Sequence, residues 1–329
     1  MLNFLRTLAV TLLLVACSST PSPAPQRSWQ VLARNVPGGA LMSGVALPDG
    51  SALLVGGQAT LGAVWQWQNA ALTAVAVPAG KLLSWASRLP DGSALVVGNG
   101  RRALWRAADG TWTVEALPDG DELWGCLAFS HDDAWAVGGD PLADGTSATP
   151  VLLHRTAAGW SPVALPKLQQ PQVRLFKVAG QNPSDVVVVG DEGEALHFDG
   201  TTWTEEPSGT GANLTTVRAL ADGRYVAVGG STTGIIQLRE TTGVWHTLRT
   251  VESGLSGVDA WDDRFWVCGA AGWLESVARD GSSAQAADML TTDDLHLMLR
   301  LPNGDALAGG GNFGAFNATM HGVLLGWSL

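Results

Sequence analysis

The sequence predicts an all-β fold, a seven-bladed β-propeller of four-stranded blades, and two observations carry this prediction. First, a turn of Asp-Gly type, a short apolar run and a glycine recur at intervals of roughly 40 residues. Second, the last copy lacks an outer strand, whereas a spare strand, WQVLARNV from Trp29, precedes the first copy. A ring whose last blade is closed by this N-terminal strand leaves no free sheet edge. The seven copies begin at Asp49, Asp91, Asp132, Asp185, Asp222, Asp262 and Asn303.

Each copy contains four apolar segments in a fixed order. An inner segment such as LLSWASRLP comes first, the Asp-Gly copy opens the second, and a segment such as ALWRAA follows the glycine. Runs such as VVVVG are apolar on both faces, which is typical of strands covered by neighbours on both sides. A solenoid is the alternative, but it would have a shorter period and would need caps. Tryptophan usually opens the fourth segment, as at Trp112, Trp160, Trp203 and Trp245.

The first 25 residues differ from the rest of the chain. Arg6 precedes an apolar run from Leu8 to Ala16, which is shorter than the about 20 residues that span a bilayer. Leu14-Val15-Ala16-Cys17 resembles the bacterial lipobox, in which the leader is cut before a lipid-modified cysteine. An ordinary secretory leader with an incidental thiol is the alternative.

Three parts are therefore expected along the chain. These are a lipoprotein signal peptide over residues 1–16, a lipidated Cys17 with a Pro- and Ser-rich tether over 17–28, and the propeller over 29–329. Ser18 follows the cysteine, which by resemblance to the sorting signals of two-membrane bacteria favours the outer membrane. The expected localisation is extracytoplasmic, with the lipid as the membrane anchor.

The net charge argues against some classes of partner, and the positions of the cysteines argue against a disulfide. The formal net charge is −11 and there is no long basic run, which argues against binding to nucleic acid or to an anionic membrane face. Cys126 and Cys268 fall in the third and sixth copies, far apart around a ring. We expect buried free thiols there rather than a disulfide.

The repeat resembles two known families. The phrase DGRYVAVGG from Asp222 resembles the kelch repeat, and turns such as Asp199-Gly200-Thr201-Thr202-Trp203 are similar to the Asp-box of neuraminidase-type and photosystem II assembly-factor propellers. The kelch resemblance suggests a comparison with the copper radical oxidases. Their copper centre needs two tyrosines, whereas Tyr225 is the single tyrosine here. The Asp-box resemblance raises sialidases, whose arginine motif has no match here. Neither family's activity is expected.

The sequence shows no metal or cofactor site. The six histidines are scattered along the copies, with no two at ligand spacing. The pairs Asp132-Asp133, Asp262-Asp263 and Asp293-Asp294 could bind calcium, but two of them lie at repeat turns, which turn chemistry explains better. We therefore expect no cofactor and no metal.

Four tryptophans lie outside the repeated position of the fourth segment. These residues, Trp85, Trp124, Trp261 and Trp273, could stack on sugars or anchor a partner if they lie at a rim. The alternative is ordinary packing in the core.

Basic residues recur on the inner segments. Arg88, Lys177, Arg218 and Arg300 each have apolar neighbours, and strict alternation would point them all in one direction. They would then line a cationic central channel that binds an anion, with Asp259 as an ion-pairing member. The alternative is that these charges only pair with carboxylates or with water.

The function expected from these observations is binding. We expect a lipid-anchored envelope propeller that is not an enzyme and that binds or scaffolds a protein partner, because no catalytic constellation can be assembled. The long connection over residues 138–150 either carries recognition or is an indifferent surface loop. The alternative function is binding of a glycan or anionic ligand, or a glycan-active enzyme, at the channel mouth.

Overall fold

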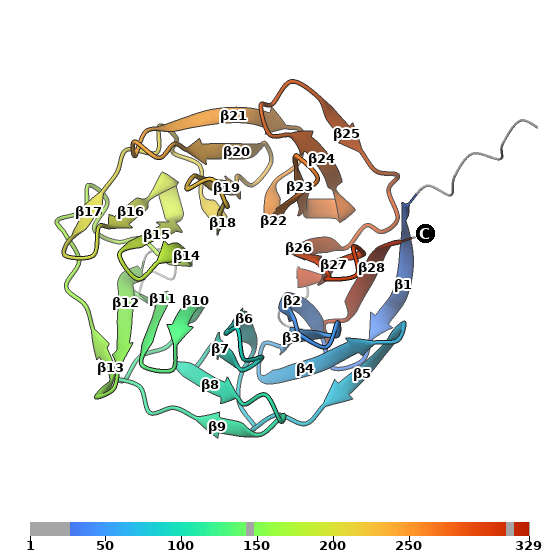
Figure 1. The fold of residues 1–329 in the computed structure, drawn as a ribbon, viewed down its shortest axis with the longest axis horizontal. Coiled ribbons are helices and arrows are strands. Elements are labelled where there is room, and N and C mark those ends of the chain that lie inside the picture. Colours follow the sequence, from blue (N-terminus) through green and yellow to red (C-terminus); the bar gives the residue numbers. More distant parts are fainter. Residues whose placement is uncertain (1–26, 143–147, 314–318, 329) are drawn as a thin grey trace, which may run out of the picture.

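The computed structural model describes residues 27–142, 148–313 and 319–328. Seven sheets of four antiparallel strands stand around a central axis, as predicted (Figure 1). Each sheet is one blade, with its first strand nearest the axis and its fourth at the circumference. Cys17 and the tether to Gln26 lie outside the described residues. No helix in the described ranges is long and apolar enough to cross a membrane.

The blades follow one another along the chain. Blade 1 comprises β2 (Ala40–Ala46), β3 (Ala52–Gln58), β4 (Leu61–Gln68) and β5 (Ala71–Val75); blade 2, β6 (Leu83–Arg88), β7 (Ala94–Gly98), β8 (Arg102–Arg106) and β9 (Trp112–Val114); blade 3, β10 (Leu123–Ser130), β11 (Asp133–Pro141), β12 (Ala148–Thr156) and β13 (Gly159–Pro162). Blade 4 comprises β14 (Leu175–Asn182), β15 (Asp185–Gly190), β16 (Ala195–Phe198) and β17 (Trp203–Glu205); blade 5, β18 (Leu214–Ala219), β19 (Tyr225–Gly229), β20 (Gly234–Arg239) and β21 (Trp245–Val251). Blade 6 comprises β22 (Leu255–Trp261), β23 (Arg264–Gly269), β24 (Leu274–Ala278) and β25 (Ala284–Ala286); blade 7, β26 (Asp294–Arg300), β27 (Ala306–Gly311), β28 (Gly322–Ser328) and β1 (Ser28–Val36). Two single 3₁₀ turns, η1 (Asp191–Gly193) and η2 (Ala270–Gly272), follow β15 and β23.

Blade 7 is built from both ends of the chain. β1 pairs with β28 in antiparallel register, with Trp29 opposite Trp327 and Gln30 opposite Gly326. The Gln30 side-chain amide also donates a hydrogen bond of 3.0 Å to the Ser328 hydroxyl. The predicted closure of the last blade by the N-terminal strand is therefore confirmed.

One leucine–glycine pair repeats in every blade and explains the glycine of the sequence repeat. A leucine near the start of the inner strand lies opposite the glycine that closes the apolar run of the second strand. A Cβ on that glycine would lie only 1.8 to 2.2 Å from the carbonyl oxygen of the residue before the leucine. Close backbone approach therefore requires glycine at this position. The pairs are Leu41–Gly56, Leu83–Gly98, Leu123–Gly138, Leu175–Gly190, Leu214–Gly229, Leu255–Gly269 and Leu295–Gly310.

A register shift follows this pair in all seven blades. One residue of the inner strand is left unpaired, as in a β-bulge, so the alternation of side chains changes there. Counted from the leucine, Lys177 lies two residues along, Arg218 and Asp259 four, and Arg88 and Arg300 five. The predicted single row of basic side chains is therefore divided among three levels of the axis.

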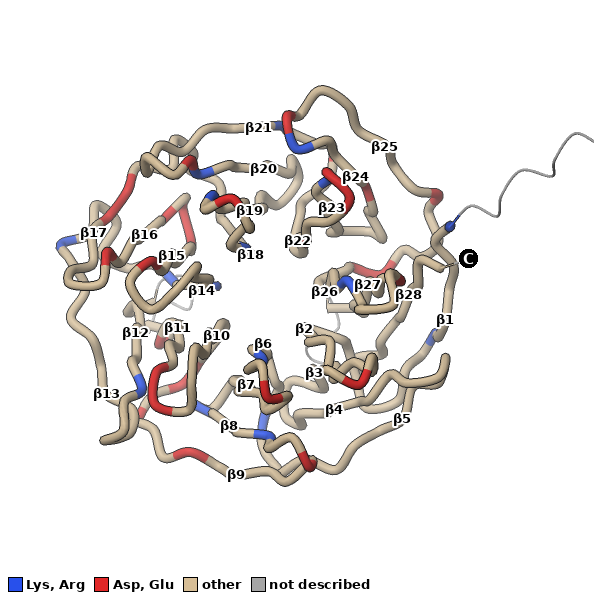
Figure 2. Tube along the Cα trace, in the orientation of Figure 1, with Lys and Arg blue, Asp and Glu red and all other residues tan. Residues whose placement is uncertain are grey.

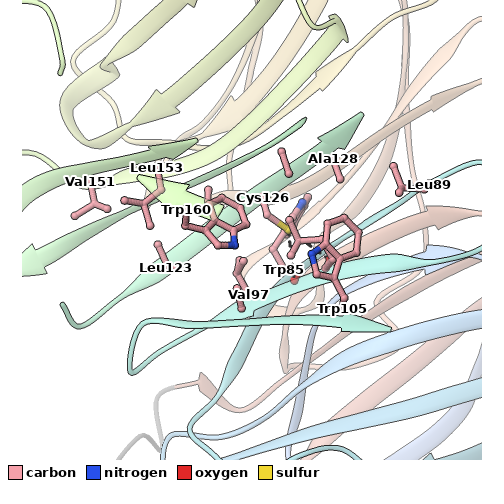
Figure 3. Close-up of a cluster of buried hydrophobic side chains, with 14 residues drawn as sticks. Trp85, Leu89, Val97, Trp105, Leu123, Cys126, Ala128, Val151, Leu153 and Trp160 are labelled. Carbon is pink, nitrogen blue, oxygen red and sulfur yellow. Dashed lines mark hydrogen bonds between the residues drawn. The ribbon is translucent and has the colours of Figure 1, made fainter. Parts of the chain in front are cut away.

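The core lies between adjacent blades. Trp105 of blade 2 packs in one cluster with Trp85, Cys126 and Trp160, the last two from blade 3 (Figure 3). Of the tryptophans that open fourth strands, Trp160, Trp203 and Trp245 are buried, and Trp112 is half-buried. Cys126 and Cys268 are both free and buried, as predicted.

The connection over residues 138–150 was predicted to be one continuous loop, but strands β11 and β12 extend into it. β11 continues to Pro141 and β12 begins at Ala148, and these two residues face each other across the hairpin. Asp140 on this extension forms an ion pair with Arg101 of blade 2, with Nη2 and Oδ2 2.5 Å apart. Backbone pairing thus organises most of the connection, and residues 143–147 lie outside the described part.

Candidate functional site

Two basic side chains meet on one tryptophan near the axis of the ring. The Lys177 ammonium, from β14, lies 4.6 Å from the ring centroid of Trp85, and the Arg218 guanidinium, from β18, lies 5.2 Å from it. Lys177 Nζ also donates a hydrogen bond of 2.9 Å to the Trp124 carbonyl, and Arg218 Nε donates one of 3.2 Å to the Val258 carbonyl. Basic segments of β6, β14 and β18 lie at the inner edge of the ring (Figure 2).

These two cations have no counter-ion within the described ranges. No carboxylate there comes within 4.0 Å of Lys177 or Arg218. The inner strands together carry four basic residues, Arg88, Lys177, Arg218 and Arg300, against Asp259 and Asp294. Of these basic residues, Lys177 and Arg218 meet on Trp85 and make this part of the axis basic in a protein whose net charge is −11.

Burial shifts the titration of the groups along the axis. Loss of hydration, with a further contribution from Arg218, lowers the pKa of Lys177 to about 7. Loss of hydration also lowers the pKa of His296 to about 3, so its imidazole is neutral at physiological pH. The gap among Trp85, Arg218, His296 and their neighbours is too narrow to hold a water molecule. We call this positive axial region the central channel.

Aromatic side chains lie near the end of the channel where the inner strands begin. Trp124 is half-buried, packs edge-on against Phe176 with ring centroids 6.3 Å apart, and donates its indole N–H to Glu122 at 3.1 Å. On the opposite side of the ring, His296 packs against Phe313 with centroids 4.5 Å apart. This end of the channel therefore combines apolar rings with hydrogen-bonding groups.

The structure separates the other predicted channel residues from this cation pair. Arg88 is exposed at the end of β6 and bonds to the adjacent Leu89 carbonyl. Arg300 packs over Trp261 and Trp327 and forms an ion pair with Asp262 at 3.7 Å.

Asp259, predicted as an ion-pairing member of the channel, has no basic side-chain nitrogen within 4.0 Å among the described residues. Its carboxylate accepts the backbone N–H groups of Ala260 and Arg300, at 2.8 and 3.1 Å. Because the strand backbone supplies these donors, the carboxylate is satisfied without a guanidinium partner.

Two of the four predicted rim tryptophans are not at a rim. Trp85 is 6% exposed at the axis, and Trp261 is 7% exposed and stacked on Trp266 at 4.8 Å. The inward course of the inner strands places both in the core. Trp124 and Trp273 are half-buried, and Trp273 packs against a cluster of buried residues from blades 5 and 6.

A glutamate-lined pocket between blades 3 and 4 was missed by the sequence reasoning. The fold brings together four glutamates from the η1–β16 segment and the end of β17, which are Glu192, Glu194, Glu205 and Glu206. The adjacent charges Glu205-Glu206 were a weak signal in the sequence. No cluster of three metal-binding side chains occurs in the described part of the chain.

Comparisons with known proteins place the chain among propellers. No protein-family model matches the sequence, and no curated protein matches it. Among solved structures, YCF48 bound to D1 peptide has a TM-score of 0.66 at 14% identity, over 93% of this chain and 98% of that chain. Virginiamycin B lyase from Staphylococcus aureus has a TM-score of 0.69 at 11% identity, over 92% and 100%. The WD40 propeller domain of Doa1 has a TM-score of 0.68 at 12% identity, over 91% and 97%.

These likenesses correct the expectation that the chain is not an enzyme. That expectation took the lack of a catalytic constellation in the sequence as evidence, yet the same fold over nearly the whole length occurs in an enzyme, virginiamycin B lyase. At 11–14% identity the likenesses show the fold alone, so they assign no reaction to this chain. Residues from different blades can assemble a site that a linear reading does not reveal.

Proposed function

We propose that this chain is a lipid-anchored propeller of the bacterial cell envelope that binds a protein partner, with an acidic segment of that partner facing the central channel. The observation that carries the proposal is the cation pair of Lys177 and Arg218 on Trp85, which lacks a carboxylate among the described residues. Buried charges in proteins are usually paired, so such a pair favours an anionic ligand.

Two further features support a polypeptide ligand. The half-buried rings of Trp124 and Phe176 provide an apolar surface beside the cations, and aromatic side chains often anchor protein partners. Propellers of similar fold include YCF48, whose structure was determined with a D1 peptide bound. The kelch-like and Asp-box-like character of the repeats stays a prediction from the sequence.

Binding of synthetic peptides tests the channel. Fluorescently labelled peptides of equal length, one rich in Asp and Glu, one rich in Lys and one neutral, would be titrated by anisotropy at low and at moderate salt. We expect the acidic peptide to bind most tightly and to weaken with salt, because exposed charge interactions are screened. At pH 6, where Lys177 is protonated, Arg218→Gln and Lys177→Met should each weaken it by about tenfold or more, since each removes one positive charge beside Trp85.

Lys167→Gln is the matched control, because Lys167 is an exposed cation on the loop between blades 3 and 4. It should leave the acidic-peptide affinity unchanged. Equal binding of acidic and neutral peptides, or loss of binding in the control, would contradict the proposal. Competition by inorganic phosphate alone at similar affinity would favour the small-anion alternative.

The membrane anchor has a separate test. In the full chain produced in a two-membrane bacterium, Cys17→Ser should move the protein from the membrane fraction to the soluble periplasmic fraction and abolish labelling by a fatty-acid analogue. Retention in the membrane fraction would refute the lipid anchor. The outer membrane is proposed from Ser18, and density-gradient separation of the two membranes tests this.

A further inference from the structure

A second feature of blade 4 lies away from the channel. A pocket of about 250 Å³, which opens to solvent, lies between the loop that joins blades 3 and 4 and the start of the third strand of blade 4. Its lining includes Gln169 and Gln170 from the loop and Glu194 and Glu205 from blade 4. No Lys, Arg or His is among the lining residues. We call it the blade 3–4 pocket.

Two of its glutamates already have partners. Glu206 forms a bidentate ion pair with Arg239, with N–O distances of 2.6 and 2.7 Å, and also accepts the Trp245 indole N–H. Glu205 accepts the backbone N–H of Gln169 at 3.0 Å. These contacts hold the walls of the pocket in place without neutralising Glu205.

Glu194 has no such partner. Glu194 is 5% exposed, and its carboxylate oxygen Oε1 has no hydrogen-bond partner among the described residues. Burial, together with the nearby Glu205 carboxylate, raises its pKa to about 7. A buried carboxylate that lacks a donor destabilises a fold, so its presence needs an explanation.

The other blades show that the fold does not need a carboxylate here. In each blade, one residue near the start of the third strand lies opposite the repeated glycine of the second strand, and in blade 4 this residue is Glu194, whose carbonyl accepts the Gly190 N–H. Five other blades have an uncharged side chain there: Ala63, Val151, Ile235, Trp273 and Val323. Blade 2 has Arg102, whose guanidinium donates to the carbonyls of Pro78 and Lys81 on the preceding loop.

Blade 2 thus has an internal partner for its charge, whereas blade 4 presents its charge to an open pocket. We propose that the blade 3–4 pocket binds an organic cation, an alkylammonium or guanidinium group, with Glu194 and Glu205 as its anionic partners. An ammonium group carries three donors and a guanidinium five, which supplies what the Glu194 carboxylate lacks. The described carboxylates do not converge as three metal ligands, which favours an organic cation over a metal ion.

This inference is independent of the channel, because its residues and the sign of its charge are different. The cation can come from a free polyamine or from a Lys or Arg side chain of a polypeptide. Isothermal titration with spermidine tests the first source. A short uncharged peptide with one central Lys, compared with the same peptide carrying norleucine, tests the second, and CaCl₂ alone tests a metal ion.

Glu194→Val places in blade 4 the residue that blades 3 and 7 have at this position. We expect it to abolish binding of the cation probe and to raise the thermal midpoint of the ligand-free protein, an outcome that a purely structural glutamate would not give. Glu194→Gln keeps the shape and should weaken binding by about tenfold or more. The control Glu252→Gln removes an exposed carboxylate and should change neither quantity.

Several outcomes would overturn the proposal. These are no binding of spermidine or the Lys peptide to the wild-type protein, equal binding to the Glu194→Gln protein, or stabilisation by CaCl₂ but by neither organic cation. A lowered thermal midpoint for Glu194→Val, with binding retained in Glu194→Gln, would show that the carboxylate is structural. Binding of spermidine but not of the Lys peptide, or the reverse, identifies the source.

Discussion

Blade 4 carries two buried ionisable side chains, one basic and one acidic, and their surroundings differ. Lys177 on the inner strand donates to the Trp124 carbonyl and lies over the Trp85 ring. Glu194 on the outer side of the same blade has a carboxylate oxygen without any partner among the described residues. Lys177 thus has a hydrogen-bond acceptor and an aromatic face but no counter-ion, which favours an anion facing it, whereas the Glu194 oxygen also lacks a hydrogen-bond donor, which favours a cation that supplies one.

Substitution of Gly190, which lies between Lys177 and Glu194 in the sheet, should cause the largest loss of stability. Gly190 pairs with Leu175, two residues before Lys177, and its N–H bonds to the Glu194 carbonyl. A Cβ there would lie 2.2 Å from the Arg174 carbonyl oxygen, so Gly190→Ala should lower the free energy of unfolding by about 3 kcal/mol or more. Urea titration followed by tryptophan fluorescence measures this.

Gly211→Ala is the matched control, because nothing lies within 4 Å of a Cβ at Gly211. It should change stability by less than about 0.5 kcal/mol. Equal losses for the two variants would show that the leucine–glycine pair does not support both charged positions.

Lys177 should show the next largest effect, through the pH dependence of stability. Its pKa is about 7 in the folded protein and 10.5 ordinarily, so between these values the unfolded chain holds a proton that the folded chain has lost. The wild-type protein should therefore gain stability relative to Lys177→Met as pH rises from 6.5 to 9.5, by up to about 3 kcal/mol. Parallel curves for the two proteins would contradict the burial of an ionisable amine at this position.

The ionisation of Glu194 should also make stability depend on pH, but in a lower pH range than that of Lys177. Its pKa is raised from 4.5 to about 7, so the unfolded chain ionises first as pH rises and the wild-type protein loses stability between these values. The stability gained by Glu194→Val should therefore be larger at pH 8 than at pH 5, by about 2 kcal/mol. A gain that does not change with pH would show that the carboxylate finds a partner that neutralises it.

The exposed aspartates of the turns provide the baseline. Asp49 accepts hydrogen bonds from the Ser51 backbone N–H and hydroxyl, which lower its pKa. That stabilisation is present above the ordinary pKa and is lost as pH falls through the lowered one. Because the carboxylate is exposed, Asp49→Ala should cost no more than about 0.5 kcal/mol at pH 7, measured by urea titration, and a larger loss would contradict this screening argument.

Local sequence patterns predicted the propeller fold well, because each blade repeats the same turn and the same apolar strand. The Asp-Gly turns, the apolar second strands and the spare N-terminal strand are all visible as short sequence features, and their periodicity set the number of blades. The side-chain directions of the inner strands were harder to predict, because the bulge after each leucine changes which side chains face the axis. For that reason Arg218 and Lys177 meet on Trp85, while Arg88 and Arg300 lie elsewhere.

The sequence by itself determined a ring of seven sheets closed by its own N-terminal strand, because turn chemistry and strand periodicity are local and are repeated along the chain. Only the tertiary structure decided which charges lack a partner. Trp85 and the two cations over it come from blades 2, 4 and 5, and the blade 3–4 pocket is lined by blade 4 and by the loops that join it to blades 3 and 5. Such neighbours are set by the packing of blades around an axis, which sequence distance does not encode.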